Sequence, residues 1–160
     1  MAAEPALRGF RAEDLAEVRR LVIRTIDAKY VRVYPPRAVD YFKQFHSEEH
    51  VMADAEQGLT VVVELDGRIV ATGTVVGNNI RRVFVLPEYQ GRGLGRLVME
   101  RLERHARAEG VETVELDVSL VSERFYDRLG YRLVKKDYIP LEDGERLDYF
   151  LMVKSMAEER

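Results

Sequence analysis

Three glycines alternate with other residues between Gly91 and Arg96, in a segment that also contains Arg92. The segment follows a β-branched run that ends at Pro87 and precedes a stretch of helical spacing, so it is expected to turn from a strand into a helix. A helix N-terminus carries unpaired N–H groups and about half a positive charge, and glycines let a ligand approach that backbone. The segment therefore predicts an anion site, and its two arginines favour a phosphate over a carboxylate.

The glycine spacing differs from the two common nucleotide signatures. No Gly-Lys-Ser/Thr sequence ends the segment, and no Gly-x-Gly-x-x-Gly pattern is followed by an acidic residue about 20 positions further on. ATP and NAD are therefore disfavoured. A tight turn without a ligand is the alternative interpretation, but such a turn needs one glycine and gains nothing from flanking arginines.

Two motifs at a recognisable separation extend this interpretation. Residues 90–95 read Gln-Gly-Arg-Gly-Leu-Gly and follow a Val-x-Val-x-Pro strand, and residues 119–131 combine a serine at a strand exit with Phe-Tyr-x-x-x-Gly-Tyr. Together they resemble the Arg/Gln-x-x-Gly-x-Gly/Ala loop and the downstream motif of the GNAT superfamily of acyl-CoA-dependent N-acyltransferases. The order of the expected elements agrees with that family from about Leu7 to Val153.

The resemblance implies that acetyl-CoA is the cosubstrate. It implies that Val83 and Val85 offer backbone groups to the pantetheine arm where two neighbouring strands splay apart, and that amides from Gln90 to Arg96 hold the diphosphate. No metal ion is implied. The predicted coenzyme-binding residues are Val83, Val85, Gln90, Gly91, Arg92, Gly93, Leu94, Gly95, Arg96 and the strand-exit residue Ser119.

Acyl transfer from a thioester to an amine needs a neutral amine, a polarised carbonyl and a proton for the departing thiolate. Tyr126 occupies the position that the resemblance assigns to the proton donor, and a core aromatic residue beside Phe125 is the alternative interpretation. The backbone N–H of Val85 is expected to polarise the carbonyl. On the next strand, alternation places Glu115 and Asp117 on one face, and each could relay a proton through water.

The identity of the general base is left open. No carboxylate stands at residues 79–82, where many relatives carry one just before the Val-x-Val segment. Water, Glu64 or another group could then deprotonate the acceptor, and a solvated strand face is at least as good an interpretation of Glu115 as a catalytic role. The missing carboxylate also suggests an alternative in which the chain is a non-catalytic acyl-CoA-binding module.

A zinc hydrolase is the weaker alternative. Residues 46–50 read His-Ser-Glu-Glu-His and fit the H-x-x-E-H pattern of inverted zinc proteases. A zinc site that used His46 and His50 would also need a third ligand with supporting contacts. The acidic neighbours and the lack of an apolar stripe favour a solvated helix instead.

An aromatic cluster follows the first expected helix. In the family that the chain resembles, the corresponding region lines the acceptor site, and the loop at residues 139–145 is expected to border the same pocket. The cluster consists of Tyr30, Tyr34, Tyr41, Phe42 and Phe45.

Periodicity predicts a mixed α/β fold around these residues. Asp66-Gly67 between two β-branched runs predicts a hairpin, because its turn needs a positive φ at both central residues. We expect one GNAT-like domain over residues 1–160 with a polar tail at 154–160, and a mostly antiparallel sheet of about 6–7 strands with helices on both faces. Helices are expected near 12–26, 37–45, 94–109 and 122–129, and strands near 6–10, 60–65, 68–76, 80–86, 113–118, 131–138 and 147–153.

Composition limits the classes of function. The chain has 160 residues, 46% of them hydrophobic, and a formal net charge of -3, which argues against a general nucleic-acid binder. It has no cysteine, no apparent signal peptide and no apolar run approaching ~20 residues, so we expect a cytoplasmic protein outside the membrane. The expected partner is a small-molecule or peptide amine, and the resemblance leans towards a homodimer.

Overall fold

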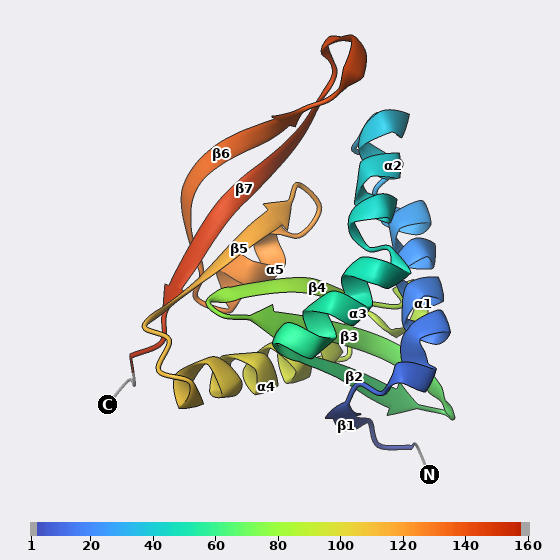
Figure 1. Ribbon diagram of the computed structural model, residues 1–160, viewed down its shortest axis with the longest axis vertical. Coiled ribbons are helices and arrows are strands. Elements are labelled where there is room, and N and C mark those ends of the chain that lie inside the picture. The colour runs from blue at the N-terminus through green and yellow to red at the C-terminus, as the bar shows by residue number, and fades with distance from the viewer. Residues whose placement is uncertain (1–2, 158–160) are drawn as a thin grey trace.

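The computed structural model describes residues 3–157 and forms one seven-stranded sheet (Figure 1). The strand order is β1-β2-β3-β4-β5-β7-β6, and every neighbouring pair is antiparallel except β4 and β5, which run parallel. The predicted mixed, mostly antiparallel sheet is confirmed. The strands are β1 (Ala6–Gly9), β2 (Leu59–Leu65), β3 (Arg68–Val76), β4 (Asn79–Val85), β5 (Thr113–Ser119), β6 (Arg132–Pro140) and β7 (Arg146–Ser155).

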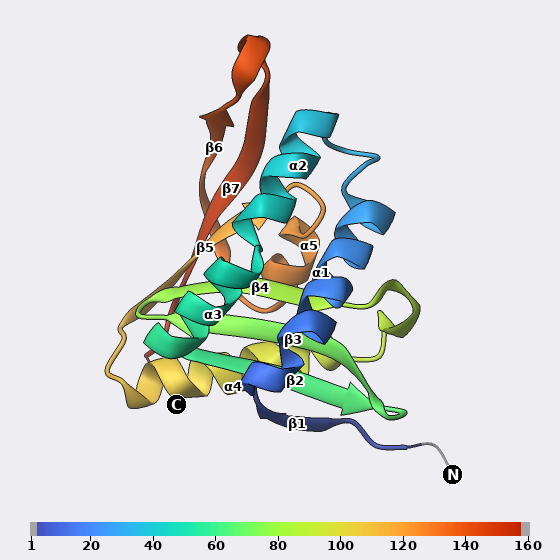
Figure 2. The same cartoon turned by 45° about the vertical axis from the view of Figure 1, so that its right-hand side comes forward.

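Helices cover both faces of the sheet, as expected. Helices α1 and α3 lie on one face of β2, β3 and β4, and α4 lies on the other (Figure 2). Within residues 3–157, no helix combines the length and apolar character needed to cross a membrane. The helices are α1 (Leu15–Lys29), α2 (Pro36–Phe45), α3 (Glu48–Gln57), α4 (Leu94–Ala108) and α5 (Glu123–Arg128).

Local sequence explains several boundaries. Asp66 and Gly67 have φ values of 56° and 74°, which confirms the hairpin between β2 and β3. The helical pattern after α2 belongs to a separate helix, because the Ser47 hydroxyl accepts a hydrogen bond from the backbone N–H of His50 (3.3 Å) and caps α3. The prediction of a solvated helix across residues 46–50 therefore holds for residues 48–50, which are helical and exposed, but not for His46, which is buried before α3 begins.

The two halves of the sheet separate between β4 and β5. Among the described residues these strands pair at a single position, Asn79 with Glu115. A β-bulge adds one residue to β4 opposite Thr72–Thr74, and Arg82 within it has a φ of 58°. A positive φ is uncommon for an arginine. β-Bulges are frequent next to active sites, where they change the direction of a side chain. The gap and the bulge together leave an opening in the middle of the sheet.

A buried polar cluster ties α4 to β7. The Glu103 side chain is 7% exposed; its carboxylate accepts hydrogen bonds from the Tyr131 hydroxyl (2.7 Å) and the Lys154 ammonium (3.1 Å). Burial and the Glu103 charge raise the pKa of Tyr131, which stays a neutral donor. The cluster fixes the position of α4, whose first turn forms part of the candidate site.

We expect Glu103→Gln to lower the free energy of unfolding by about 1–3 kcal/mol, because it weakens two buried hydrogen bonds and leaves the Lys154 charge without its partner. Urea unfolding measures this change. Glu100→Gln, an exposed substitution on the same helix, is the matched control and should change stability little. Equal effects of the two substitutions would show that the buried cluster does not stabilise the fold.

Candidate active site

Two cavities meet where β4 and β5 separate. They share Tyr30, Val83, Phe84 and Ser122 as lining residues. We call the cavity against the first turn of α4 the basic cavity and the one between α2 and the β6–β7 hairpin the aromatic cavity. A group held in one cavity can therefore reach a group held in the other across these shared residues.

The basic cavity has a volume of about 570 Å³ and a lining suited to an anion. Lys29 of α1, Arg96 of α4 and Arg128 of α5 line it, and no described acidic residue does. Three positive charges without a carboxylate favour a ligand with several negative charges.

The loop before α4 has the geometry of an anion cradle. Gly91 and Gly93 have φ values of 80° and 82°, and a Cβ added at either would meet nothing within 4 Å. The first helical hydrogen bond runs from the Leu97 N–H to the Gly93 carbonyl (3.1 Å), and Gly93 has no side chain to cap the helix. In the described part of the chain the N–H groups of residues 94–96 therefore have no hydrogen-bond partner, and all three residues line the basic cavity.

Two residues of this loop have structural roles that the sequence did not indicate. A Cβ at Gly95 would lie 2.8 Å from the Phe125 ring, so this glycine lets α5 pack against α4. The Arg92 guanidinium lies 4.8 Å from the Tyr89 ring centroid and is not among the residues that line the basic cavity. Arg92 thus stabilises the turn, whereas Arg96 contributes its charge to the cavity.

The end of β4 presents backbone groups to the gap. The Leu86 N–H donates to the Val70 carbonyl of β3 (2.9 Å), and peptide groups alternate along a strand, so the groups of Val85 face away from β3. The Gln90 side chain donates to the Val85 carbonyl (2.9 Å) and links the glycine loop to the strand. The Val85 N–H remains directed into the gap, where Val83 also lines both cavities.

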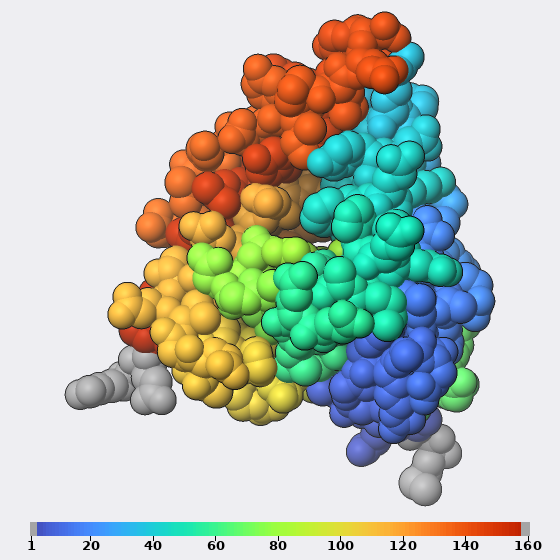
Figure 3. Space-filling view, in the orientation of Figure 1, coloured from blue at the N-terminus to red at the C-terminus, as the bar shows by residue number. Residues whose placement is uncertain are grey.

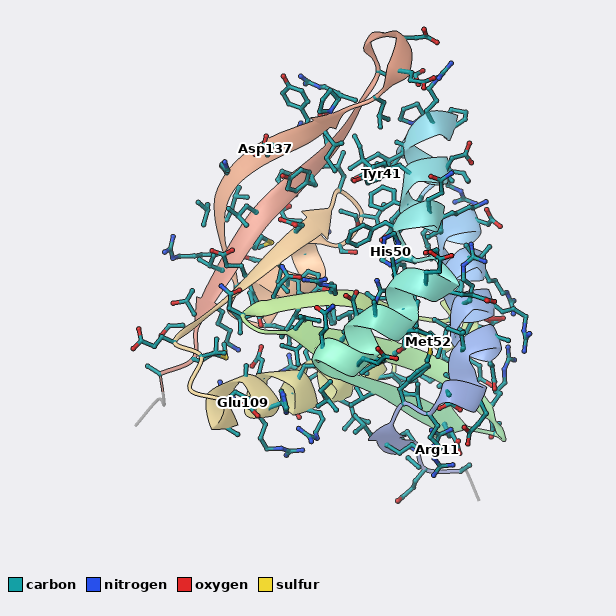
Figure 4. The ribbon with its side chains drawn as sticks, in the orientation of Figure 1. Arg11, Tyr41, His50, Met52, Glu109 and Asp137 are labelled. Atoms are coloured by element: carbon teal, nitrogen blue, oxygen red, sulfur yellow. The ribbon has the colours of Figure 1, made fainter. Side chains whose placement is uncertain are left out.

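The aromatic cavity is smaller, about 160 Å³, and opens between α2 and the β6–β7 hairpin. Figure 3 shows the surface hollowed between these segments, and Figure 4 shows Tyr41 on the side of α2 that faces the hairpin. Tyr34 of the predicted aromatic cluster lines neither cavity, because its hydroxyl donates to the Asp148 carbonyl of β7 (2.7 Å), whereas the other four members line this cavity. Tyr41, Phe42 and Phe45 come from α2, and Ile139, Leu147 and Tyr149 from the hairpin.

Asp117 is the carboxylate that lines the aromatic cavity. Burial and, secondarily, the charge of Glu115 raise its pKa. Glu115 lines neither cavity, and its negative charge is a secondary cause of the raised pKa of Asp117. Glu64 accepts hydrogen bonds from the Arg8 side chain (2.6 Å) at the β1–β2 edge and lines neither cavity.

Hydroxyl groups gather at the junction of the cavities. Tyr126 lines the aromatic cavity, and burial raises its pKa well above the usual value for a phenol. Burial also raises the pKa of Tyr30, which lines both cavities. The Ser119 hydroxyl donates to the Ser122 hydroxyl (3.2 Å); Ser119 lines the aromatic cavity and not the basic one. All four groups are neutral hydrogen-bonding groups at neutral pH.

Burial and a hydrogen bond from Arg82 keep His46 neutral. The Arg82 Nε donates to His46 Nδ1 (2.9 Å), so the ring proton resides on Nε2. Burial, followed by the Arg82 charge, lowers the pKa of His46 well below 6.5. His46 follows α2 whereas His50 lies in α3, and residues 3–157 contain no group of three His, Cys, Asp or Glu placed to hold a metal. The geometry thus offers no support for the zinc alternative.

Sequence reasoning missed Lys29, Arg128 and Arg82. Lys29 and Arg128 end their helices, where a basic residue usually indicates only a favourable interaction with the helix dipole. Nothing in the local sequence indicates that Arg82 is buried with Asp54 of α3, to which it donates a hydrogen bond (3.0 Å).

Comparison with known proteins identifies the family. The family model described as "Acetyltransferase (GNAT) family" matches residues 21–131, more than half of the chain, so the chain belongs to the GNAT acetyltransferase family. An uncharacterized N-acetyltransferase of Chlorobaculum tepidum is 37% identical over 71 residues, 44% of each chain. An uncharacterized acetyltransferase of Streptococcus pyogenes is 33% identical over 97 residues, 58% of this chain and 65% of the relative. The matched segments span less than two thirds of either relative.

Solved structures agree with the fold. A Rhodopseudomonas palustris protein described as a GCN5-related N-acetyltransferase and class-II aminotransferase has a TM-score of 0.86 and 25% identity, over 97% of this chain and 98% of that one. The PaiA N-acetyltransferase of Thermoplasma acidophilum, solved in complex with coenzyme A, has a TM-score of 0.75 and 16% identity, over 95% and 99%. The GNAT fold predicted from the sequence is confirmed.

We expect the free energy of unfolding to fall as pH drops below about 6.5. The His46 ring binds a proton at this pH in the unfolded chain but stays neutral in the folded protein, where its pKa is lowered. The contribution approaches about 1.4 kcal/mol per pH unit between the folded and unfolded pKa values of this one group. Urea unfolding between pH 7.5 and 5 measures it. His46→Gln, which keeps an acceptor for Arg82, should flatten the slope, and exposed His50→Gln should not. An unchanged slope in His46→Gln would contradict the assignment.

Proposed function

We propose that the protein transfers an acetyl or other short acyl group from coenzyme A to a primary amine by direct attack. The observation that carries the proposal is the meeting of the two cavities at Tyr30, Val83, Phe84 and Ser122. One cavity suits a polyanion, and the other offers a carboxylate and apolar walls for an amine. Membership of the GNAT acetyltransferase family supports acyl transfer.

The residues present fit coenzyme A. The free N–H groups at the start of α4 and the charges of Lys29, Arg96 and Arg128 would hold its phosphates. Open space at Gly91 and Gly93 lets phosphate oxygens approach the backbone. When bound, the coenzyme supplies an acyl group activated as a thioester. The structures with coenzyme A or acetyl-CoA among its fold neighbours support this assignment.

The chain's own residues then promote attack by the amine. Asp117 accepts a proton from the acceptor ammonium, directly or through water, because its raised pKa makes it a better base than an exposed aspartate. The Val85 N–H stabilises negative charge that develops on a carbonyl oxygen. The raised pKa of Tyr126 makes complete proton loss costly, so its hydroxyl stabilises the departing thiolate by a hydrogen bond. The second proton of the attacking nitrogen, released as the amide forms, passes to that thiolate and gives the free thiol.

The direct test is thiol release from acetyl-CoA in the presence of a panel of primary amines, with the acetylated amine identified by mass spectrometry. The proposal expects thiol release that depends on the amine and equals the acetyl-amine formed. Coenzyme binding with no acetylation of any amine would contradict it and support a binding module. Stabilisation by zinc without any response to acetyl-CoA would contradict the acyl-transfer assignment as well.

We expect Gly93→Val to abolish measurable coenzyme A binding, because a side chain at a φ of 82° distorts the cradle and obstructs approach to its amides. Gly144→Val is a matched control: its φ is 75°, it also has open space, and it lies at the tip of the β6–β7 hairpin. Both substitutions should cost about 1–2 kcal/mol of stability. Calorimetric titration should show normal coenzyme affinity for Gly144→Val, and equal losses in the two variants would count against the cradle.

We expect activity to decline on the acid side at a higher pH than for an ordinary aspartate base, because Asp117 works only when ionised and its pKa is raised. Asp117→Asn should lower kcat by about 10²–10⁴-fold. Glu115→Gln should keep most of the activity and move the acid limb to lower pH, because it removes a charge that raises the pKa of Asp117.

The profile is measured with an amine of known pKa, so that titration of the acceptor can be separated from that of the enzyme. An acid limb that is identical in the wild type and Glu115→Gln would show that Asp117 is not the titrating group.

A further inference from the structure

The aromatic cavity contains charges of both signs. Asp117 on β5 and Arg81 on β4 both line it, and the positive charge of Arg81 lowers the pKa of Asp117 against the effect of burial. An acceptor that carried only an ammonium group would be attracted by Asp117 and repelled by Arg81. The lining therefore suits a molecule with a positive and a negative group close together.

The positive charge at β4 is only partly neutralised. Asp54 lies between two arginines: its carboxylate accepts from Arg81 Nη1 (3.2 Å) and from Arg82 Nη1 (3.0 Å). One carboxylate for two guanidinium groups leaves one positive charge of this cluster without an ion-pair partner of its own, since Asp117 is near Arg81 but forms no ion pair with it among the described residues. His46, which also lines the cavity, is neutral and does not change this balance.

The excess charge is available at Arg81 rather than Arg82. The Arg82 side chain is 0% exposed and donates to Asp54, His46 and the Phe45 carbonyl, so its donors are occupied. The Arg81 side chain is 28% exposed; its Nε donates to Asn79 Oδ1 (2.7 Å). Its Nη2 has no partner among residues 3–157. Arg81 can therefore donate to an anionic ligand group without breaking a bond.

The remaining features limit the size and charge of the ligand. Arg81 stands two residues before Val83, roughly 6–7 Å along the strand from the junction of the cavities, so the anionic group lies within a few bonds of the reacting amine. The single negative charge of a carboxylate matches the one positive charge that Arg81 offers. A doubly charged phosphate would place a second negative charge near Asp117, which would repel it. Tyr41, Phe42 and Phe45 give the rest of the ligand an apolar wall.

From these observations we propose that the acceptor is a free amino acid with an apolar side chain, whose carboxylate binds Arg81 while its amine faces Asp117. This inference rests on the proposed function and makes Arg81 a specificity-determining residue. Neither a peptide N-terminus nor a simple amine has a carboxylate next to the reacting nitrogen, so both lack the partner for Arg81.

Matched acceptors test the proposal. Phenylalanine, phenylalaninamide and phenethylamine share an amine and an aromatic group, and differ in carrying a carboxylate, a neutral amide or neither; leucine, leucinamide and 3-methylbutylamine form a second set. Thiol release gives kcat and KM for each. We expect kcat/KM for at least one amino acid to exceed those of its amide and amine by about tenfold or more, mainly through KM.

Variants separate a carboxylate contact from a general effect on the fold. Arg81→Gln should abolish the preference for the amino acid while leaving acetyl-CoA affinity unchanged, and Arg81→Lys should restore part of it. Arg104→Gln, at an exposed arginine on α4, should keep the full preference. Calorimetric binding of N-acetylphenylalanine and N-acetylleucine to the protein with coenzyme A, each against the corresponding N-acetylamine, gives a readout that needs no turnover.

Each outcome decides between the claims. Acetylation of the amides or amines as efficiently as the amino acids would overturn the inference and leave the proposed function intact. Binding of acetyl-CoA with no binding or acetylation of either amino acid would also overturn the inference. Failure of acetyl-CoA to bind would overturn the proposed function, and the inference with it.

Discussion

The parting of β4 from β5 is the constraint on which the rest of the site depends. These parallel strands pair at Asn79 and Glu115 and then diverge, so backbone groups at the end of β4 have no neighbouring strand to bind. A buried sheet normally satisfies such groups, because an unpaired N–H away from water is costly. Here they face a gap that joins the basic and aromatic cavities, and a ligand can supply the missing partners.

The β-bulge at Arg82 shapes the β4 side of this gap. A left-handed arginine persists because its buried guanidinium is held by Asp54 of α3 and by His46 after α2. The same contacts fix His46 as a neutral donor and connect α2 and α3 to the central strand. One polar cluster thus positions both the wall of the aromatic cavity and β4, the strand that presents the Val85 N–H to the gap.

Features encoded locally were predicted from the sequence. The Asp66-Gly67 hairpin and the helix that begins at Leu94 depend on residues within a few positions of each other, and both are confirmed. The glycine loop was also recognised, but Gly95 serves packing against Phe125, a contact with a residue 30 positions away that no local pattern reveals. The glycines therefore serve two purposes: Gly91 and Gly93 leave the backbone open to a ligand, and Gly95 makes room for the Phe125 ring.

The site could be predicted only where one segment determines it. Alternation placed Glu115 and Asp117 on one face of β5, but which of them lines a cavity depends on where β4 diverges and on how deeply each is buried. Arg82 could not be predicted, because its backbone conformation is stabilised by a helix 28 residues earlier in the chain. Lys29 and Arg128 come from two separate helices that only the folded chain brings to the same cavity.

A crystal structure with bound coenzyme A would show whether the start of α4 holds a diphosphate. We expect diphosphate oxygens within hydrogen-bond distance of the amides of residues 91–96, and a thiol beside Val83 and Tyr126 where the two cavities join. A coenzyme whose diphosphate lies away from the start of α4, or a gap closed by pairing between β4 and β5, would contradict this expectation.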